Sequence, residues 1–236
     1  MDFQDLWKMM IELFGLSNTG KSYLKRKLEE ERYLVLKTEK ISSFIKIIYL
    51  LKYLLRHPIN TIYLFYILNN NHLTIDRLSL NKKLKVLIMR NSYLAFVLSK
   101  YEQIKNEKER IFIDEFSFQS LFMILQNKSS EENIQKIIRK LPKSDILFVF
   151  EANREKRHKA YKKLHPYKKG AILLPASWID KSYAKSLMEV MEYNFEIIKK
   201  IILKNYNEDK EAVSEINKIK LPKEYKRDIK ISVYRK

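Results

Sequence analysis

The residues best spaced for chemistry lie near the N-terminus, in the segment FGLSNTGKSYL at 14–24. Gly15 and Gly20 are separated by four residues and followed directly by Lys21 and Ser22, which satisfies the Walker A pattern G-x-x-x-x-G-K-[ST]. Glycines permit a tight loop whose amides surround a phosphate at the positive end of the next helix. Lysine then reaches the β- and γ-phosphates, and the hydroxyl holds Mg²⁺. The segment predicts a nucleoside triphosphate site.

A chance match is the alternative interpretation of this segment. The chain contains only three glycines, and two of them stand at this spacing before a Lys-Ser pair. The motif also lies in its required context, because an apolar run precedes it and a helical pattern follows it. We therefore expect the nucleotide to be contacted by Gly15, Ser17, Asn18, Thr19, Gly20, Lys21, Ser22 and Tyr23.

A second set of chemical groups follows the apolar run at 111–113, where Asp114 and Glu115 come directly after it. A carboxylate at the tip of a strand beside the phosphate loop can hold the water shell of Mg²⁺ or accept a proton from an attacking hydroxyl. We assign Asp114 to the metal side and Glu115 to the base, and the two assignments could be exchanged. The alternative is an ordinary acidic turn that caps the next helix.

A strongly basic segment, NREKRHKAYKK and onward over 153–170, follows the most apolar strand pattern. Phosphoryl transfer spreads negative charge over three oxygens, and a basic lid would stabilise that charge and exclude water. Arg154 and Arg157 are the candidate clamp residues, with Lys159 and Lys163 as weaker ones. The alternative is a solvated basic face.

The elements that must position these groups alternate between short apolar runs and helical patterns, which predicts an α/β fold with a mostly parallel sheet covered on both faces. One domain is expected over 1–236, with a helical, acceptor-binding insertion at 40–106 that breaks at Pro58 and at Asn69–Asn71. The segment 229–233 reads as an extra edge strand or a loose tail. Strands are expected at 8–14, 33–36, 111–113, 146–150 and 201–205, and helices at 21–32, 116–141, 178–198 and 211–219.

The composition narrows the class of protein. The chain has no cysteine, which excludes disulfides, thiolate metal sites and a cysteine nucleophile. The start at Met1–Lys8 is acidic and polar, which predicts no signal peptide and a cytoplasmic location. The net charge of +19 indicates an anionic partner such as nucleotide, nucleic acid or anionic lipid, or else a compositional drift toward lysine.

The most apolar stretch, Ile41–Leu68, is interrupted by charged residues and Pro58, so no transmembrane segment is expected there. Its interleaved basic and apolar residues leave two interpretations open. One is a helical core insertion, and the other is peripheral docking on an anionic membrane surface. The oligomeric state also stays open, and a homodimer is one alternative.

Four segments together resemble the P-loop nucleoside and nucleotide kinases of the thymidylate-kinase-like group. They are IELFGLSNTGKSYL at 11–24, FIDEFSFQ at 112–119, FVFEANREKRHKAYKKL at 148–164 and KIILKNYNEDKEAVSEINKI at 200–219. The resemblance implies a P-loop NTPase fold with a parallel core of about five strands, and ATP with Mg²⁺ as donor. It also implies that Asn205–Asp209 lies near the adenine.

The chain departs from this family in three places. Asp114-Glu115-Phe116 lacks the usual arginine after the middle strand, Arg154 and Arg157 are out of the customary spacing, and the insertion matches no known pattern. The Asp114, Glu115 and Gln119 arrangement resembles divergent members of the group, some of them associated with surface-polysaccharide synthesis.

The expected function is therefore transfer of the γ-phosphate of ATP to a hydroxyl or phosphate of a small acceptor. The acceptor classes are a nucleoside, a nucleotide, a sugar or a glycan end. The alternative, motivated by the basic charge, is a nucleic-acid-binding ATPase or a polynucleotide 5′-hydroxyl kinase. The aromatic residues count against it, because they fall at helical core spacing and do not alternate with basic residues.

Overall fold

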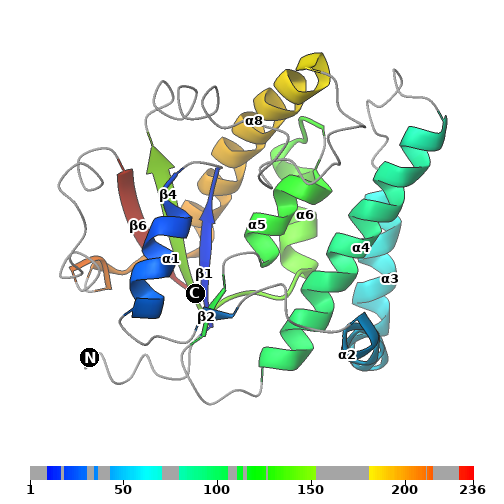
Figure 1. Ribbon diagram of the computed structural model, residues 1–236, viewed down its shortest axis with the longest axis horizontal. Helices are drawn as coiled ribbons and strands as arrows, with labels where there is room; N and C mark the ends of the chain where they lie inside the picture. The colour runs from blue at the N-terminus through cyan, green and yellow to red at the C-terminus, as the bar shows by residue number, and fades with distance from the viewer. Residues whose placement is uncertain are drawn as a thin grey trace.

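The computed structural model describes residues 10–16, 19–30, 35–36, 43–70, 80–105, 111–113, 116–125, 127–152, 181–210, 212–214 and 229–236. Over these residues the chain is an α/β structure with one mixed sheet and helices packed on both faces of it (Figure 1). The strands are β1 (Met10–Gly15), β2 (Val35–Leu36), β3 (Ile111–Ile113), β4 (Ile146–Ala152), β5 (Asn207–Glu208) and β6 (Ile229–Arg235).

The sheet has the strand order β2-β3-β1-β4-β6-β5 in the described part of the chain. Strands β2, β3, β1 and β4 are parallel, whereas β6 runs antiparallel to β4, and β5 antiparallel to β6. The predicted parallel sheet is thus confirmed for the first four strands. The prediction of a mostly parallel sheet of about five strands holds in part, because β6 and β5 add two antiparallel strands beside β4 and bring the sheet to six strands.

The central strand β1 is buried on both sides because its sequence, MIELFG, is almost wholly apolar. Ile11 and Leu13 pack with Leu24 and Leu28 of α1 (Lys21–Glu30) on one face of the sheet. On the other face Phe14 enters a larger cluster with α5 (Ser117–Ile124), α6 (Glu131–Lys140) and α8 (Lys181–Asn205). This alternation follows from the two-residue period of a strand.

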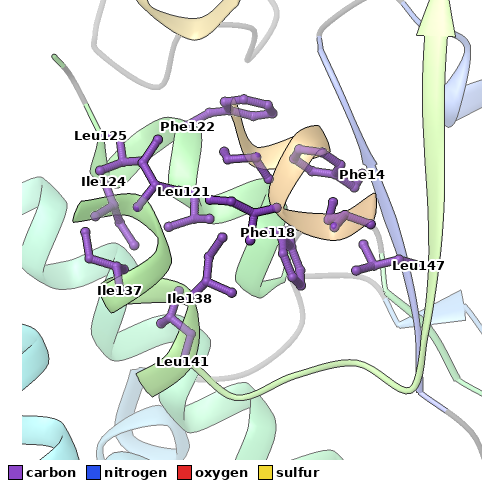
Figure 2. Close-up of a cluster of buried hydrophobic side chains, with 14 of the residues drawn as sticks. Phe14, Phe118, Leu121, Phe122, Ile124, Leu125, Ile137, Ile138, Leu141 and Leu147 are labelled. Atoms are coloured by element: carbon purple, nitrogen blue, oxygen red, sulfur yellow. The ribbon is translucent and has the colours of Figure 1, made fainter. Parts of the chain in front are cut away.

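The larger cluster holds the loop end of β1 against the helices (Figure 2). The Phe14 ring stacks on the rings of Phe122 in α5 and Phe195 in α8, each with centroids 5.3 Å apart. Phe118 meets Phe14 edge-on with centroids 6.0 Å apart. These contacts tie β1, α5 and α8 together directly beneath the segment that follows β1.

The expected helical insertion consists of α2 (Ser43–Arg56), α3 (Pro58–Asn70) and α4 (Leu80–Ile104), which lie together at the side of the molecule away from β6 (Figure 1). The predicted break at Pro58 is confirmed, because α3 begins at this proline, which has no N–H to lose in a first turn. None of the described helices is long and apolar enough to cross a membrane.

Two predicted elements differ from the structure. The helix expected over 116–141 is two helices, because the Ser130 hydroxyl accepts a hydrogen bond from the Asn133 amide (3.3 Å) and starts α6. The strand expected at 201–205 is wrong, since α8 continues to Asn205 with Ile201 and Ile202 buried and Leu203 and Lys204 exposed. The segment expected as an edge strand or tail is β6, which lies inside the sheet.

Candidate functional site

The site begins where β1 ends at Gly15 and α1 begins at Lys21. Gly20 has a φ of 84°, a left-handed conformation that side-chain-bearing residues rarely adopt. Its carbonyl accepts hydrogen bonds from the amides of Tyr23 (3.0 Å) and Leu24 (3.1 Å), so Gly20 forms the start of the helix. The strand–loop–helix context required by the motif is therefore present, while Ser17 and Asn18 lie outside the described residues.

Gly15 occupies a position that excludes a side chain. A Cβ atom built there would lie 2.7 Å from the backbone oxygen of Phe150 and 2.9 Å from the Cβ of Phe150. Gly15 and Phe150 are paired in the parallel ladder of β1 and β4, so the close contact is fixed by the sheet. The first glycine of the motif is thus required for packing against β4.

Lys21 is folded over the loop. Its Nζ donates hydrogen bonds to the carbonyl oxygens of Gly15 and Leu16, the latter at 2.8 Å. The buried Thr19 hydroxyl also donates to the Leu16 carbonyl (2.7 Å) and closes the loop from inside. The first turn of α1 carries no acidic residue. The Lys21 charge and the positive end of the helix therefore both favour an anion at this loop.

Ser22 and Tyr23, the remaining motif residues in the first turn of α1, differ from each other in exposure. Ser22 is exposed at the start of α1, where its hydroxyl is accessible to a ligand. Tyr23 is half-buried, and its ring lies under the Arg26 guanidinium with 5.6 Å between the Arg26 Cζ and the ring centroid. The structure therefore brings Gly15, Thr19, Gly20, Lys21, Ser22 and Tyr23 of the predicted set into one loop and one helical turn.

A buried network that sequence reasoning missed supports the loop from below. The Gly15 amide donates to the side-chain oxygen of Gln119 (3.1 Å), and the Gln119 amide donates to Glu12 Oε1 (2.8 Å). The Ser144 hydroxyl donates weakly to Glu12 Oε2 (3.4 Å). Helix α5 has no side-chain cap of its own at Phe116, so Glu12 of β1 serves its N-terminal amides instead.

Burial dominates the electrostatics of Glu12, which is fully inaccessible to solvent. Desolvation raises the pKa of Glu12 to about 8, and the amides of Gln119 and Phe118, the Ser144 hydroxyl and the Lys100 charge counteract it only in part. The signal in the sequence was a lone glutamate inside the apolar run MIELF. It indicates either that the strand prediction is wrong or that a buried acid has hydrogen-bond partners.

The other predicted site residues lie outside the described part of the chain. These are Asp114 and Glu115, Arg154 and Arg157, Lys159 and Lys163, and the whole lid at 153–170. Their preceding strands are described. Ile113, the last residue of β3, pairs with Glu12 on one side of β1, and Phe150 of β4 pairs with Gly15 on the other. Both strands thus end at the edge of the sheet where the loop begins.

A cavity of about 530 Å³ lies beside the loop, between the end of β4 and α8. Its size is that of a small-molecule site. Acidic side chains dominate its polar lining, and Lys199 joins two of them, with its Nζ 2.8 Å from Glu151 Oε2 and 3.0 Å from Glu196 Oε2. The lining residues are Leu16, Thr19, Lys128, Phe150, Glu151, Ala152, Glu189, Glu192, Tyr193, Phe195 and Glu196.

The segment expected near the adenine, Asn205–Asp209, lies at the opposite end of the sheet from the loop. Asn207 pairs with Arg235, which pairs with Ile146 at the start of β4, whereas the loop adjoins Phe150 near the end of β4. The reason is the length of α8, which lines the cavity through Glu189–Glu196 and then continues past the sheet to Asn205 before the chain turns into β5.

Comparison of the chain with protein-family models, with curated proteins and with solved structures finds no match in any of the three. Among the described residues, no group of three His, Cys, Asp or Glu side chains is arranged to hold a metal ion. Mg²⁺ in phosphate sites usually keeps several waters and takes one or two protein ligands besides the phosphates, so the exposed Ser22 hydroxyl fits such an ion.

Proposed function

We propose that this chain is a P-loop kinase that transfers the γ-phosphate of ATP to a hydroxyl group of a small acceptor. The observation that carries the proposal is the loop between β1 and α1. Gly20 takes a left-handed conformation, Gly15 packs without space for a side chain, and Lys21 holds its ammonium over the loop carbonyls. A loop of this kind at the carboxyl end of a central parallel strand is suited to a polyphosphate.

In this proposal the roles follow from the positions in the chain. The Lys21 ammonium binds the β- and γ-phosphates, and the amides at the start of α1 bind the β-phosphate. Ser22 and Asp114 would hold Mg²⁺, which neutralises charge on the phosphates when bound. Glu115 would accept the proton of the attacking hydroxyl, and Arg154 and Arg157 would stabilise the charge that spreads over the transferred group.

The acidic cavity favours an uncharged or amine-bearing acceptor with hydroxyl groups over a phosphorylated one. Four glutamates line it, against one lysine in the lining and Lys199 beside it, and none of its lining residues belongs to the insertion at 40–106 where the sequence predicted the acceptor. Carboxylates accept hydrogen bonds from hydroxyls and repel phosphate oxygens in a partly enclosed space. A nucleoside, a sugar or a glycan end is therefore a better acceptor than a nucleotide, and the phosphate-rich end of a nucleic acid is disfavoured for the same reason.

The test is ATP consumption in the presence of an acceptor panel of nucleosides, nucleoside monophosphates, sugars, lipid-linked glycans and 5′-hydroxyl oligonucleotides. We expect turnover with a hydroxyl acceptor, and a loss of about 100-fold or more in Lys21→Ala, because the main charge on the transferred phosphate is removed. Lys25→Ala, one turn further along α1, is the matched control and should keep its activity.

The outcomes separate the two parts of the proposal. Acceptor-dependent turnover that survives in Lys21→Ala, or no binding of Mg-ATP by calorimetry, would contradict a P-loop kinase. Turnover with nucleoside monophosphates or oligonucleotides alone would leave the kinase in place and contradict the hydroxyl acceptor inferred from the cavity.

A further inference from the structure

Helices α2 and α3 carry an exposed apolar surface outside the candidate site. Leu55 and Ile59, on either side of the junction at His57, are each 80% exposed. More than half of each side chain is also exposed at Ile47, Leu51, Ile62 and Tyr66. We call these six residues the α2–α3 face.

The α2–α3 face is a continuous stripe on each helix. In α2 its members recur every four residues, and in α3 they recur at spacings of three and four. Residues at these spacings share one side of a helix. The opposite sides are buried, because Tyr53 and Leu64 pack into the main core with Leu94 and Leu98 of α4. Packing within the fold therefore buries only the inner sides of α2 and α3. Their apolar outer sides stay exposed, which marks a candidate interaction surface.

The segment that carries this face has a basic sequence. Between residues 41 and 105 the chain has ten Lys and Arg and two acidic residues, Asp76 and Glu102, and of these Arg90, Lys100 and Glu102 are buried. On α2 itself Lys52 is exposed, and the Arg56 side chain is 55% exposed with its Nη1 3.0 Å from Oε2 of the buried Glu102. An apolar stripe within a basic segment is the combination that attracts a helix to an anionic lipid surface.

We propose that the α2–α3 face docks on an anionic membrane surface, with α2 and α3 lying in the plane of the interface. A second copy of this chain is a poorer occupant, because a symmetric contact would bring two basic faces together. Nucleic acid is poorer as well, because five of the six exposed residues are aliphatic and only Tyr66 could stack on a base. Aliphatic side chains gain most by entering the acyl boundary of a bilayer.

The experiment is co-sedimentation of the full chain with phosphatidylcholine vesicles, with or without about 30% phosphatidylserine. The wild type should sediment with the anionic vesicles, and added salt should weaken the binding. Leu55→Glu combined with Ile59→Glu should lower the partition coefficient at least about tenfold, because two apolar contacts become like charges to the lipid. Lys21→Ala should bind as the wild type does, so the result is independent of the kinase proposal.

The matched control is Leu203→Glu, which places the same change at an exposed leucine of α8 and should keep vesicle binding. The side chains of Leu55, Ile59 and Leu203 are all exposed, so we expect each variant to fold as the wild type does. Circular dichroism checks the folding of each variant. A wild type that stays in the supernatant would overturn the proposal, as would equal losses in the double variant and the control. Sedimentation velocity that shows a wild-type dimer dissociated by the double variant would assign the face to self-association instead.

Discussion

Replacement of the buried Glu12 by glutamine should remove a large part of the pH dependence of stability. In the folded chain burial raises the pKa of this carboxyl from 4.5 to about 8. Between these values the folded state holds a proton that the unfolded state has lost, so the free energy of unfolding falls as pH rises. The stabilisation is complete below pH 4.5 and is lost as pH rises to about 8.

The magnitude follows from the difference between the two pKa values. At about 1.4 kcal/mol per pH unit, the interval from 4.5 to about 8 corresponds to about 5 kcal/mol in total. Over the range from about pH 5.5 to about pH 7.5, the wild type should lose about 3 kcal/mol that Glu12→Gln does not lose. Glutamine keeps an acceptor for the Gln119 amide and carries no charge at any pH, so it imitates the protonated acid.

The assay is urea unfolding followed by circular dichroism at a series of pH values. The two curves of stability against pH should converge near pH 4.5 and separate steadily above it, with the variant more stable. Glu208→Gln changes an exposed carboxylate of β5 and should run parallel to the wild type. Parallel curves for Glu12→Gln as well would refute the reasoning, because they would mean that burial in the fold does not hold a proton on this side chain.

Two further predictions concern the loop. Gly15→Ala should destabilise the fold by about 1–3 kcal/mol, measured by urea unfolding, since its Cβ would lie 2.7 Å from the Phe150 backbone oxygen; an unchanged midpoint would contradict the close contact. Gln119→Leu should weaken Mg-ATP binding several-fold in calorimetry, because the Gly15 amide loses its acceptor and the loop is less fixed, at a cost of about 1 kcal/mol. Unchanged affinity in Gln119→Leu would mean that the network serves α5 alone.

Much of the central sheet and of the loop could be predicted because the signals are local. The runs at 111–113 and 146–150 are apolar and bounded by charged residues, a pattern that is typical of a buried strand. Gly15, Gly20 and Lys21 were recognisable because their chemistry depends on spacing within eight residues. Pro58 likewise marked the start of α3 through its own backbone.

The parts that could not be predicted depend on where distant segments meet. Ile201 and Ile202 are equally apolar in a strand or a helix, and their place in α8 was decided by the core they enter. Strand β6 is antiparallel because it begins opposite Ala152 at the end of β4 and runs back to Arg235 opposite Ile146, a placement that no local pattern records. The acidic cavity likewise needs β4 and α8 side by side.

Glu12 shows most clearly the difference between what the sequence determines and what the tertiary structure decides. The sequence alone shows a glutamate inside an apolar strand. A carboxyl group buried there is costly unless it is hydrogen-bonded, so partners are expected. Its partners are the amide of Gln119 and the hydroxyl of Ser144, which lie more than 100 residues away in the sequence. They meet Glu12 only because α5 and the segment that precedes β4 pack against β1. Local propensity selects elements, whereas burial and hydrogen bonding between elements select what each buried group can do.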